Sequence, residues 1–245
     1  METMKVLLIV PAYNEEKNIV KTVETIQQAQ KESMEHVELD YLVVNDGSTD
    51  RTEEICKEHG FQHITLVDNL GIGGAVQTGY IYADRHGYDV AVQFDGDGQH
   101  DIQGLPQLLE PLATGDWDFT VGSRFLQEGS SGFQSTVARR MGIRLLSSLI
   151  KLVSGERIQD VTSGFRAASK RVIRAFATDY PVDYPEPESL ISLSKQGFRI
   201  KEVPVNMFER TGGVSSISFF KSIYYMIKVT LAILCAAARK GEVKK

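Results

Sequence analysis

The chain has 245 residues, a length that suits one domain or one domain with an appendage, and 42% of its residues are hydrophobic, which is enough for a core. Its formal net charge of −5 argues against nucleic acid as the main partner, because binding a phosphate backbone requires a basic surface. The first apolar run, Val6–Val10, ends at Pro11 and is too short for a secretory signal, so we expect a protein that stays in the cytoplasm.

The first half of the chain alternates between short apolar runs and segments with helical periodicity. Asn14 is predicted to cap the first helix, with Glu15 and Glu16 in its first turn. The alternating order implies a mainly parallel sheet covered by helices on both faces, which is an α/β fold. Strands are predicted near residues 5–10, 39–44, 64–67, 90–94 and 118–121, and helices near 15–30, 50–58, 73–85 and 104–112.

The second half of the chain begins with a long amphipathic helix, predicted at 134–154. Arg139, Arg140 and Arg144 lie on its polar side. Its apolar side is expected to contain Val137, Met141, Leu145, Ser148, Leu149 and Leu152. A strand at 163–167, helices at 170–177 and 188–196, and a strand at 199–205 are predicted to follow.

The C-terminal stretch 217–238 is apolar except for Lys221 and Lys228. Its longest uncharged run, Val229–Ala238, is much shorter than the roughly 20 residues needed to span a bilayer. An amphipathic helix that lies in the membrane interface, with its lysines at the headgroups, fits this pattern better. The alternative is a helix that packs on the domain core or on a partner.

Residues 93–101 contain the most informative motif, in which Asp95 and Asp97 follow the apolar run 90–92 and are separated by one glycine. Two carboxylates at the end of a strand can bind one hard cation together. Mg²⁺ and Mn²⁺ take oxygen ligands and usually share them with substrate phosphates. The motif therefore predicts a metal-bound diphosphate, and the alternative is a solvated acidic turn.

Polar residues also follow two other predicted strands. Pro11, Ala12, Tyr13 and Glu15 follow the first, and Asp46 follows the second. Ligands of open α/β sheets bind at the carboxyl ends of the strands, so these residues are expected to share a site with Asp95.

The glycines at 71–74 superficially match a dinucleotide-binding fingerprint. They follow the third predicted strand rather than the first, and no acidic residue closes a ribose site further on. Close packing of the Gly73 backbone against a nucleotide, or a simple tight turn, is the better interpretation.

Taken together, these motifs resemble the family 2 glycosyltransferases, which have the GT-A fold. They are most similar to the dolichol-phosphate mannose synthase branch, whose members act on polyprenyl phosphates. The resemblance covers roughly residues 5–215. Its motifs are Pro11–Glu15, Asn45–Asp50, Asn69–Ala75, Asp95–His100, Gly122–Arg124, Thr162–Arg166 and Glu202–Val205.

The resemblance implies that different segments of the chain have different functions. Residues 1–213 would form the catalytic domain, with the nucleotide and metal in 1–125 and the acceptor in 126–213, and 214–245 would be a docking helix. The nucleotide sugar would lie against Pro11, Ala12, Tyr13, Glu15, Asp46, Gly73 and Asp95. Asp95, Asp97 and Gln99 would hold Mg²⁺ or Mn²⁺, and Arg124 would meet the donor diphosphate or the acceptor phosphate.

The expected chemistry at the acceptor is that of a phosphate that is already anionic, which needs cations but no general base. Arg124, Arg139, Arg140 and Arg210 are the candidate cations, and solvated positions on a helix or loop are the alternative for them. In the 184–188 segment, two prolines are expected to hold Glu186 and Glu188 in a stiff loop. These two carboxylates could orient the sugar or an arginine, or Glu188 could simply begin the next helix.

The expected function is an inverting, metal-dependent glycosyltransferase with catalytic residues Asp97, Arg124, Glu186 and Glu188. It would move one hexose or N-acetylhexosamine from a nucleotide sugar to undecaprenyl or dolichyl phosphate for cell-surface glycan assembly. Transfer to a saccharide hydroxyl and a catalytically inactive recruitment module are the alternatives. The Gln-x-x-Arg-Trp motif of polysaccharide synthases is absent, since Trp117 is the one tryptophan. We expect a peripheral protein at the inner face of the cell membrane, where the C-terminal helix docks alone, on a small hydrophobic membrane protein, or in a homo-oligomer.

Overall fold

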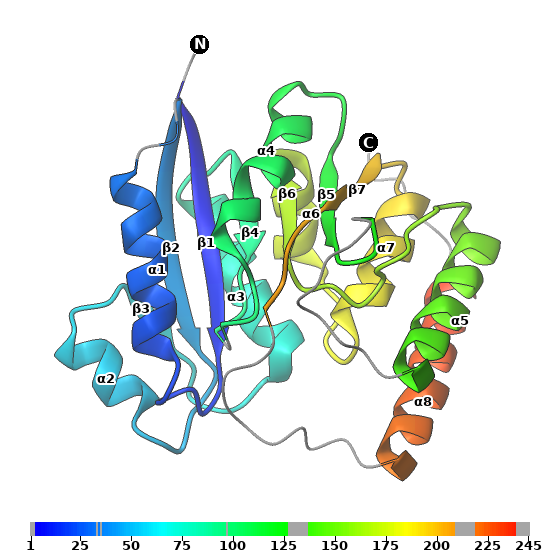
Figure 1. Ribbon diagram of the computed structural model, residues 1–245, viewed down its shortest axis with the longest axis horizontal. Helices are drawn as coiled ribbons and strands as arrows, with labels where there is room; N and C mark the ends of the chain where they lie inside the picture. The colour runs from blue at the N-terminus through cyan, green and yellow to red at the C-terminus, as the bar shows by residue number, and fades with distance from the viewer. Residues whose placement is uncertain are drawn as a thin grey trace.

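The computed structural model describes residues 3–32, 34, 36–96, 98–126, 137–208 and 219–238, with the backbone alone for 137–140 and 219–225. These residues form a seven-stranded sheet in the order β3-β2-β1-β4-β6-β5-β7 (Figure 1). The strands are β1 Met4–Ala12, β2 Val37–Asn45, β3 His63–Thr65, β4 Val90–Gln93, β5 Phe119–Ser123, β6 Arg166–Ser169 and β7 Ile200–Pro204. Only β6 runs antiparallel to its neighbours within this sheet, so the predicted mainly parallel α/β fold is confirmed.

Helices cover both faces of the sheet, as the apolar run Val6–Val10 within β1 requires. Val6, Leu8 and Val10 face a core layer formed with α1 and α4, whereas Leu7 and Ile9 face the layer formed with α3 and α6. The second layer continues into α5, α7 and α8. The helices are α1 Ile19–Lys31, α2 Thr52–Glu58, α3 Gly71–Arg85, α4 Leu105–Ala113, α5 Val137–Ser154, α6 Lys170–Thr178, α7 Pro185–Lys195 and α8 Phe219–Ala238, with a short 3₁₀ turn at Ile102–Gly104.

The strand register brings the polar strand ends together. Ala12 at the end of β1 pairs with Asn45 at the end of β2, and Ile9 of β1 pairs with Gln93 at the end of β4. The antiparallel strand β6 then places Arg166 opposite Gln93. Residues from the first and second halves of the chain therefore meet at one edge of the sheet.

Three predictions about where an element begins are wrong. α1 begins at Ile19, and Asn14 does not cap it but adopts a left-handed conformation with φ 57°. The residues after Tyr184 form the first turn of α7 and not a stiff loop, since the helix begins at Pro185, and proline is well tolerated at the first position of a helix. β6 begins at Arg166, three residues later than predicted.

Most of the predicted apolar side of α5 faces outward, although Leu149 is partly buried against the core; the side chain of Val137 lies outside the described residues. Met141, Leu145 and Leu152 are exposed, whereas the core contacts come from Ile143, Leu146 and Ile150 on the opposite side of the helix, as the full pattern of burial shows. α5 is apolar on two sides, so periodicity identifies a stripe but not which stripe is buried. In α8, Val229 and Ile233 are fully buried and Ile227, Leu231 and Leu234 are exposed. None of the helices described is long and apolar enough to cross a membrane.

Candidate active site

A pocket of about 420 Å³ opens at the carboxyl ends of β1, β2 and β4. Six of the seven residues predicted to bind the nucleotide sugar line it, namely Pro11, Ala12, Tyr13, Glu15, Asp46 and Asp95. Gly73 is not among the lining residues. A Cβ on Gly73 would lie 2.3 Å from the carbonyl oxygen of Val182, so this glycine allows α3 to pack closely on the chain before α7.

The first wall of the pocket is held by Asn14, which joins the loops after β1 and β2. The Asn14 Oδ1 accepts hydrogen bonds from the backbone N–H groups of Thr49, at 2.9 Å, and Asp50, at 3.3 Å. The Asn14 N–H in turn donates to the Ser48 Oγ at 3.0 Å. Asparagine tolerates the left-handed conformation needed here. Asn14 therefore joins the two loops beside the pocket and does not cap α1.

The second wall is held by Asp46, which is buried. Its Oδ1 accepts a 2.7 Å hydrogen bond from the Leu70 N–H, and its backbone oxygen accepts one from the Asn69 side chain. These bonds bring the segment before α3 to the pocket. A carboxylate oxygen remains for a ligand, since a carboxylate accepts several hydrogen bonds.

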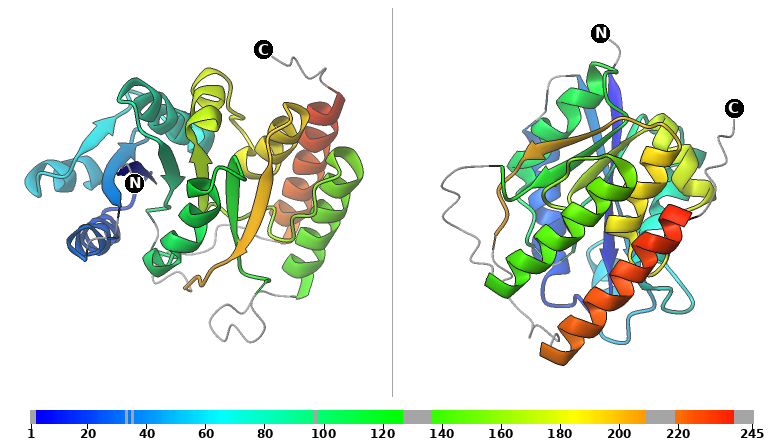
Figure 2. Two further views of the ribbon diagram at one scale, coloured as in Figure 1. Left: turned by 90° about the horizontal axis from the view of Figure 1, so that it is seen from above. Right: turned by 90° about the vertical axis from the view of Figure 1, so that its right-hand side faces the viewer.

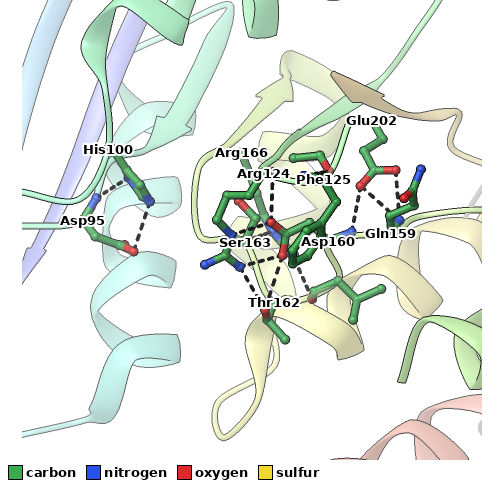
Figure 3. Close-up of polar contacts among 12 residues, drawn as sticks. Asp95, His100, Arg124, Phe125, Gln159, Asp160, Thr162, Ser163, Arg166 and Glu202 are labelled. Carbon is green, nitrogen blue, oxygen red and sulfur yellow. Dashed lines mark hydrogen bonds and ion pairs between the residues drawn. The ribbon is translucent and has the colours of Figure 1, made fainter. Parts of the chain in front are cut away.

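The floor of the pocket contains Asp95, which two neighbouring side chains orient. Its Oδ1 accepts a 2.9 Å hydrogen bond from the Gln93 side chain. Its backbone N–H donates to the His100 Nδ1 at 3.0 Å, and the His100 Nε2 lies 3.5 Å from Asp95 Oδ2 (Figure 3). Because Nδ1 accepts a hydrogen bond, the ring proton of a neutral His100 lies on Nε2 and faces the carboxylate.

Aromatic rings hold His100 in place. Its ring stacks on Phe165 with centroids 4.9 Å apart and meets the edge of Phe94. Beside it, Gly164 leaves room for the aspartate, because a Cβ there would lie 2.5 Å from Asp95 Oδ2. The absence of a side chain at Gly164 therefore leaves room for the Asp95 carboxylate beside His100.

The chemistry of the donors suits a hard divalent ion. Asp95 keeps 30% of its side chain exposed at the pocket, and both the Asp95 carboxylate and the Gln99 amide offer oxygen. Asp97, the other predicted ligand, lies outside the described residues. The described part of the chain contains no group of three His, Cys, Asp or Glu side chains that could hold a metal by themselves.

Arg124 at the end of β5 forms a buried ion pair with Asp160. Its Nε and Nη2 donate to the two carboxylate oxygens at 2.6 and 2.7 Å, and Nη2 also donates to the Thr162 Oγ1 (Figure 3). The Arg124 side chain is 6% exposed and that of Asp160 is 0% exposed. Asp160 is held in turn by Glu202 of β7, which accepts hydrogen bonds from the N–H groups of Gln159 and Asp160.

Arg166 connects the sheet to the first turn of α7. Its guanidinium donates to the backbone oxygens of Val161, Ser163 and Glu186 and to the Ser189 Oγ. Burial raises the pKa of the Glu186 carboxyl above its ordinary value, and the nearby Arg166 charge opposes part of this rise.

Gln93 lies between the two halves of the site, since its side chain donates to Asp95 and its backbone pairs with Arg166 of β6, the residue that holds the first turn of α7. Glu188 lies one residue beyond Pro187 in the same first turn of α7. Arg139 and Arg140 are in the first turn of α5, where only the backbone is described, and Arg210 lies outside the described residues.

Sequence reasoning assigned no role to Gln93, His100, Asp160, Arg166 or Glu202. His100, Arg166 and Glu202 stand inside the motifs that carry the family resemblance, which was the available signal. Asp160 lies two residues before Thr162 in a stretch with no distinctive pattern.

A ligand pocket at the carboxyl ends of parallel strands, lined in part by carboxylates, is typical of α/β enzymes that bind phosphorylated ligands. The glycosyl transferase family 2 model matches residues 7–176. The undecaprenyl-phosphate mannosyltransferase of Micrococcus luteus is 32% identical over 88% of each chain. The polyprenol monophosphomannose synthase of Mycolicibacterium smegmatis is 30% identical over 88% of this chain and 82% of its own.

A solved structure supports the same fold. Glucosyl-3-phosphoglycerate synthase from Mycobacterium tuberculosis, in complex with Mn²⁺, UDP-glucose and phosphoglyceric acid, aligns with a TM-score of 0.66 and 18% identity, over 96% of this chain and 80% of that chain. The chain belongs to glycosyl transferase family 2. It is therefore a glycosyltransferase, and its sheet is that of the GT-A fold.

Proposed function

We propose that this enzyme transfers one sugar from a nucleotide-sugar donor to a polyprenyl phosphate of the undecaprenyl or dolichyl type, with inversion at the anomeric carbon. The observation that carries the proposal is one continuous arrangement: the pocket reaches Asp95, Gln93 donates to Asp95, and Arg166, which lies opposite Gln93 on β6, donates to the backbone oxygen of Glu186 in the acceptor half. The named relatives from Micrococcus luteus and Mycolicibacterium smegmatis add support, since their names specify polyprenyl acceptors.

On the donor side, Pro11, Ala12, Tyr13, Glu15 and Asp46 would hold the nucleoside, and Asp95 would face the sugar diphosphate. A Mg²⁺ or Mn²⁺ ion held by Asp95, Asp97 and Gln99 would offset the negative charge that develops on the departing diphosphate. His100 and Gln93 would keep the Asp95 carboxylate in one orientation, which is what the neighbours of a metal ligand usually do.

On the acceptor side, a phosphate oxygen would attack the anomeric carbon as the bond to the nucleoside diphosphate breaks. The phosphate is already anionic, so no side chain has to remove a proton. Two described arginines at the site already bind other groups of the protein. Arg124 is paired with Asp160, and Arg166 donates hydrogen bonds to α7 and to the loop before β6. The charge of Arg124 is offset in part, so Arg139, Arg140 and Arg210 are the main cations proposed for the acceptor phosphate.

Glu186 and Glu188 would position the acceptor half. Burial raises the pKa of Glu186, so this carboxyl holds its proton to a higher pH than an exposed glutamate does. Because the reaction needs no general base, the role proposed for Glu186 is to orient Gln93 and, through it, Asp95.

The experiment is to incubate the purified protein with radiolabelled nucleotide sugars and a short-chain polyprenyl phosphate, and to extract the lipid product. We expect a mild-acid-labile glycosyl phosphate whose anomeric configuration, measured by NMR, is opposite to that of the donor. Asp46→Asn should weaken donor binding, while Asp89→Asn, which changes an exposed carboxylate paired with Lys170, serves as the matched control. Transfer to a saccharide with none to the lipid would favour the polysaccharide alternative. No transfer with any donor would favour a recruitment module.

A lipid acceptor places the enzyme at a membrane, and nucleotide sugars of the cytoplasm place it at the inner face. The product would then be a lipid-linked sugar for the assembly of cell-surface glycans.

A further inference from the structure

α5 and α8 lie side by side and form the outer layer on one side of the molecule (Figure 2, right). Gly142 of α5 allows a close approach, since a Cβ there would lie 3.2 Å from the Met226 sulfur of α8. The other end of α8 is held by Lys195 of α7, whose Nζ donates to the backbone oxygens of Ala236 and Ala237. A cation at the carbonyl end of a helix is favourable, so α8 is fixed on the domain and its outward side is defined.

The outward sides of these two helices form an exposed apolar surface, which we call the α5–α8 face. Six of the thirteen large hydrophobic side chains that are exposed among the described residues lie on it. They are Met141, Leu145 and Leu152 of α5 and Ile227, Leu231 and Leu234 of α8, with exposed fractions of 45–82%. A cluster of this kind on a soluble domain marks an interaction surface.

The charge of the α5–α8 face identifies its partner. Neither helix contains an aspartate or glutamate, although the whole chain has a net charge of −5. Arg144, Lys151 and Lys228 are exposed on the same sides as the apolar residues. Apolar side chains between basic ones match the surface of an anionic bilayer, where the chains enter the headgroup region and the cations meet lipid phosphates. A second copy of the same face would instead bring like charges together.

We propose that the α5–α8 face docks on the surface of an anionic lipid bilayer. The inference deepens the proposed function and rests on it in one respect, since a lipid acceptor requires the site to stand at the membrane. Both helices begin at the end of the molecule where the parallel strands end (Figure 1). Docking through them would hold the pocket edge beside the headgroups, where the phosphate of a polyprenyl phosphate lies.

The test is co-sedimentation of the full chain with vesicles of phosphatidylcholine alone or mixed with phosphatidylglycerol, without donor or acceptor. We expect binding to the anionic vesicles that weakens as salt is raised. Replacing two exposed residues together, Leu152→Glu and Leu231→Glu, should lower this binding at least about tenfold, because apolar contacts are lost and negative charge is added. Val67→Glu is the matched control, since Val67 is 97% exposed and follows β3, at the opposite end of the sheet.

Four results would overturn the proposal. The double variant could bind anionic vesicles as well as the unchanged protein does. Binding could be equal on both kinds of vesicle, which would remove the role of charge. Sedimentation equilibrium could show a dimer that the double variant breaks, or binding could require a membrane protein added to the vesicles, either of which would make the face a protein interface.

The failure of the proposed function would look different. Vesicle binding is measured in the absence of transfer, and the double variant should still glycosylate a short, water-soluble polyprenyl phosphate at the normal rate. If neither protein transfers sugar but the vesicle results hold, the docking surface stands and the assigned reaction does not.

Discussion

Asp160→Asn should be one of the most destabilising single substitutions in this protein. The change preserves the shape of the side chain but removes the charge that Arg124 meets through two bonds of 2.6 and 2.7 Å. Arg124 would then be buried without its bidentate carboxylate partner, and removing one partner of a buried ion pair costs about 3–5 kcal/mol. For a chain of this length that loss corresponds to a fall in Tm of about 6–20 °C.

The assay is thermal and urea unfolding followed by circular dichroism. Glu54→Gln is the matched control, because Glu54 also binds an arginine, Arg51, at 3.0 Å but in the open, and its loss should leave Tm almost unchanged. The double variant Arg124→Met, Asp160→Leu should recover much of the lost stability, since apolar residues can replace a buried pair. A loss below about 1 kcal/mol for Asp160→Asn, or simple additivity in the double variant, would refute this reasoning.

Four further predictions concern the site. Asp97→Ala should lower the transfer rate by about 10² or more with the fold intact, and a chelator should abolish activity until Mg²⁺ or Mn²⁺ is restored. His100→Phe, which keeps a ring between its aromatic neighbours, should weaken Mn²⁺ binding in calorimetry by about 10–100-fold. In the unchanged protein, the raised pKa of Glu186 contributes to the free energy of unfolding; the contribution is complete below the ordinary value of 4.5 and is lost as the pH rises through the folded-state pKa. Glu186→Gln should remove this pH dependence. Arg140→Ala should raise the KM for the lipid phosphate more than the KM for the donor.

Each of these has a contrary outcome. Full turnover in chelator would remove the metal from the mechanism. Unchanged Mn²⁺ affinity in His100→Phe would make that histidine a packing residue only. Parallel urea-midpoint curves against pH for Glu186→Gln and the unchanged protein would mean that Glu186 titrates normally, and an equal rise of both KM values would separate Arg140 from the acceptor.

The strands and the pocket at their carboxyl ends were predictable because both depend on local signals. Apolar runs mark the parallel strands, and the carboxyl ends of such strands must share an edge, so Pro11, Asp46 and Asp95 could be grouped before their contacts were known. The direction of β6 could not be predicted in the same way. A four-residue strand has the same pattern in either direction, and its pairing with β4 is decided by the rest of the fold.

The remaining errors share one physical cause, which is that a side chain often serves a distant part of the chain. Asparagine is a common helix-capping residue, yet the Asn14 side chain accepts hydrogen bonds from Thr49 and Asp50 in the loop after β2. No motif in the sequence around Asp160 indicates its role, because its partner Arg124 is 36 residues away along the chain. α5 has apolar residues on two sides, and only the positions of α7 and α8 determine that Ile143 and Ile150 are the buried ones.

The anchoring of α8 bears on how this enzyme can be handled in the laboratory. Val229 and Ile233 complete the same core layer as α3, α6 and α7, and Lys195 binds the last carbonyls of the helix. Deleting α8 to obtain a more soluble protein would open that layer to water. Replacing the exposed Leu231 and Leu234 with polar residues would reduce the exposed apolar surface and leave the core covered. Such a variant is therefore better suited to crystallisation or cryo-microscopy than a chain without α8.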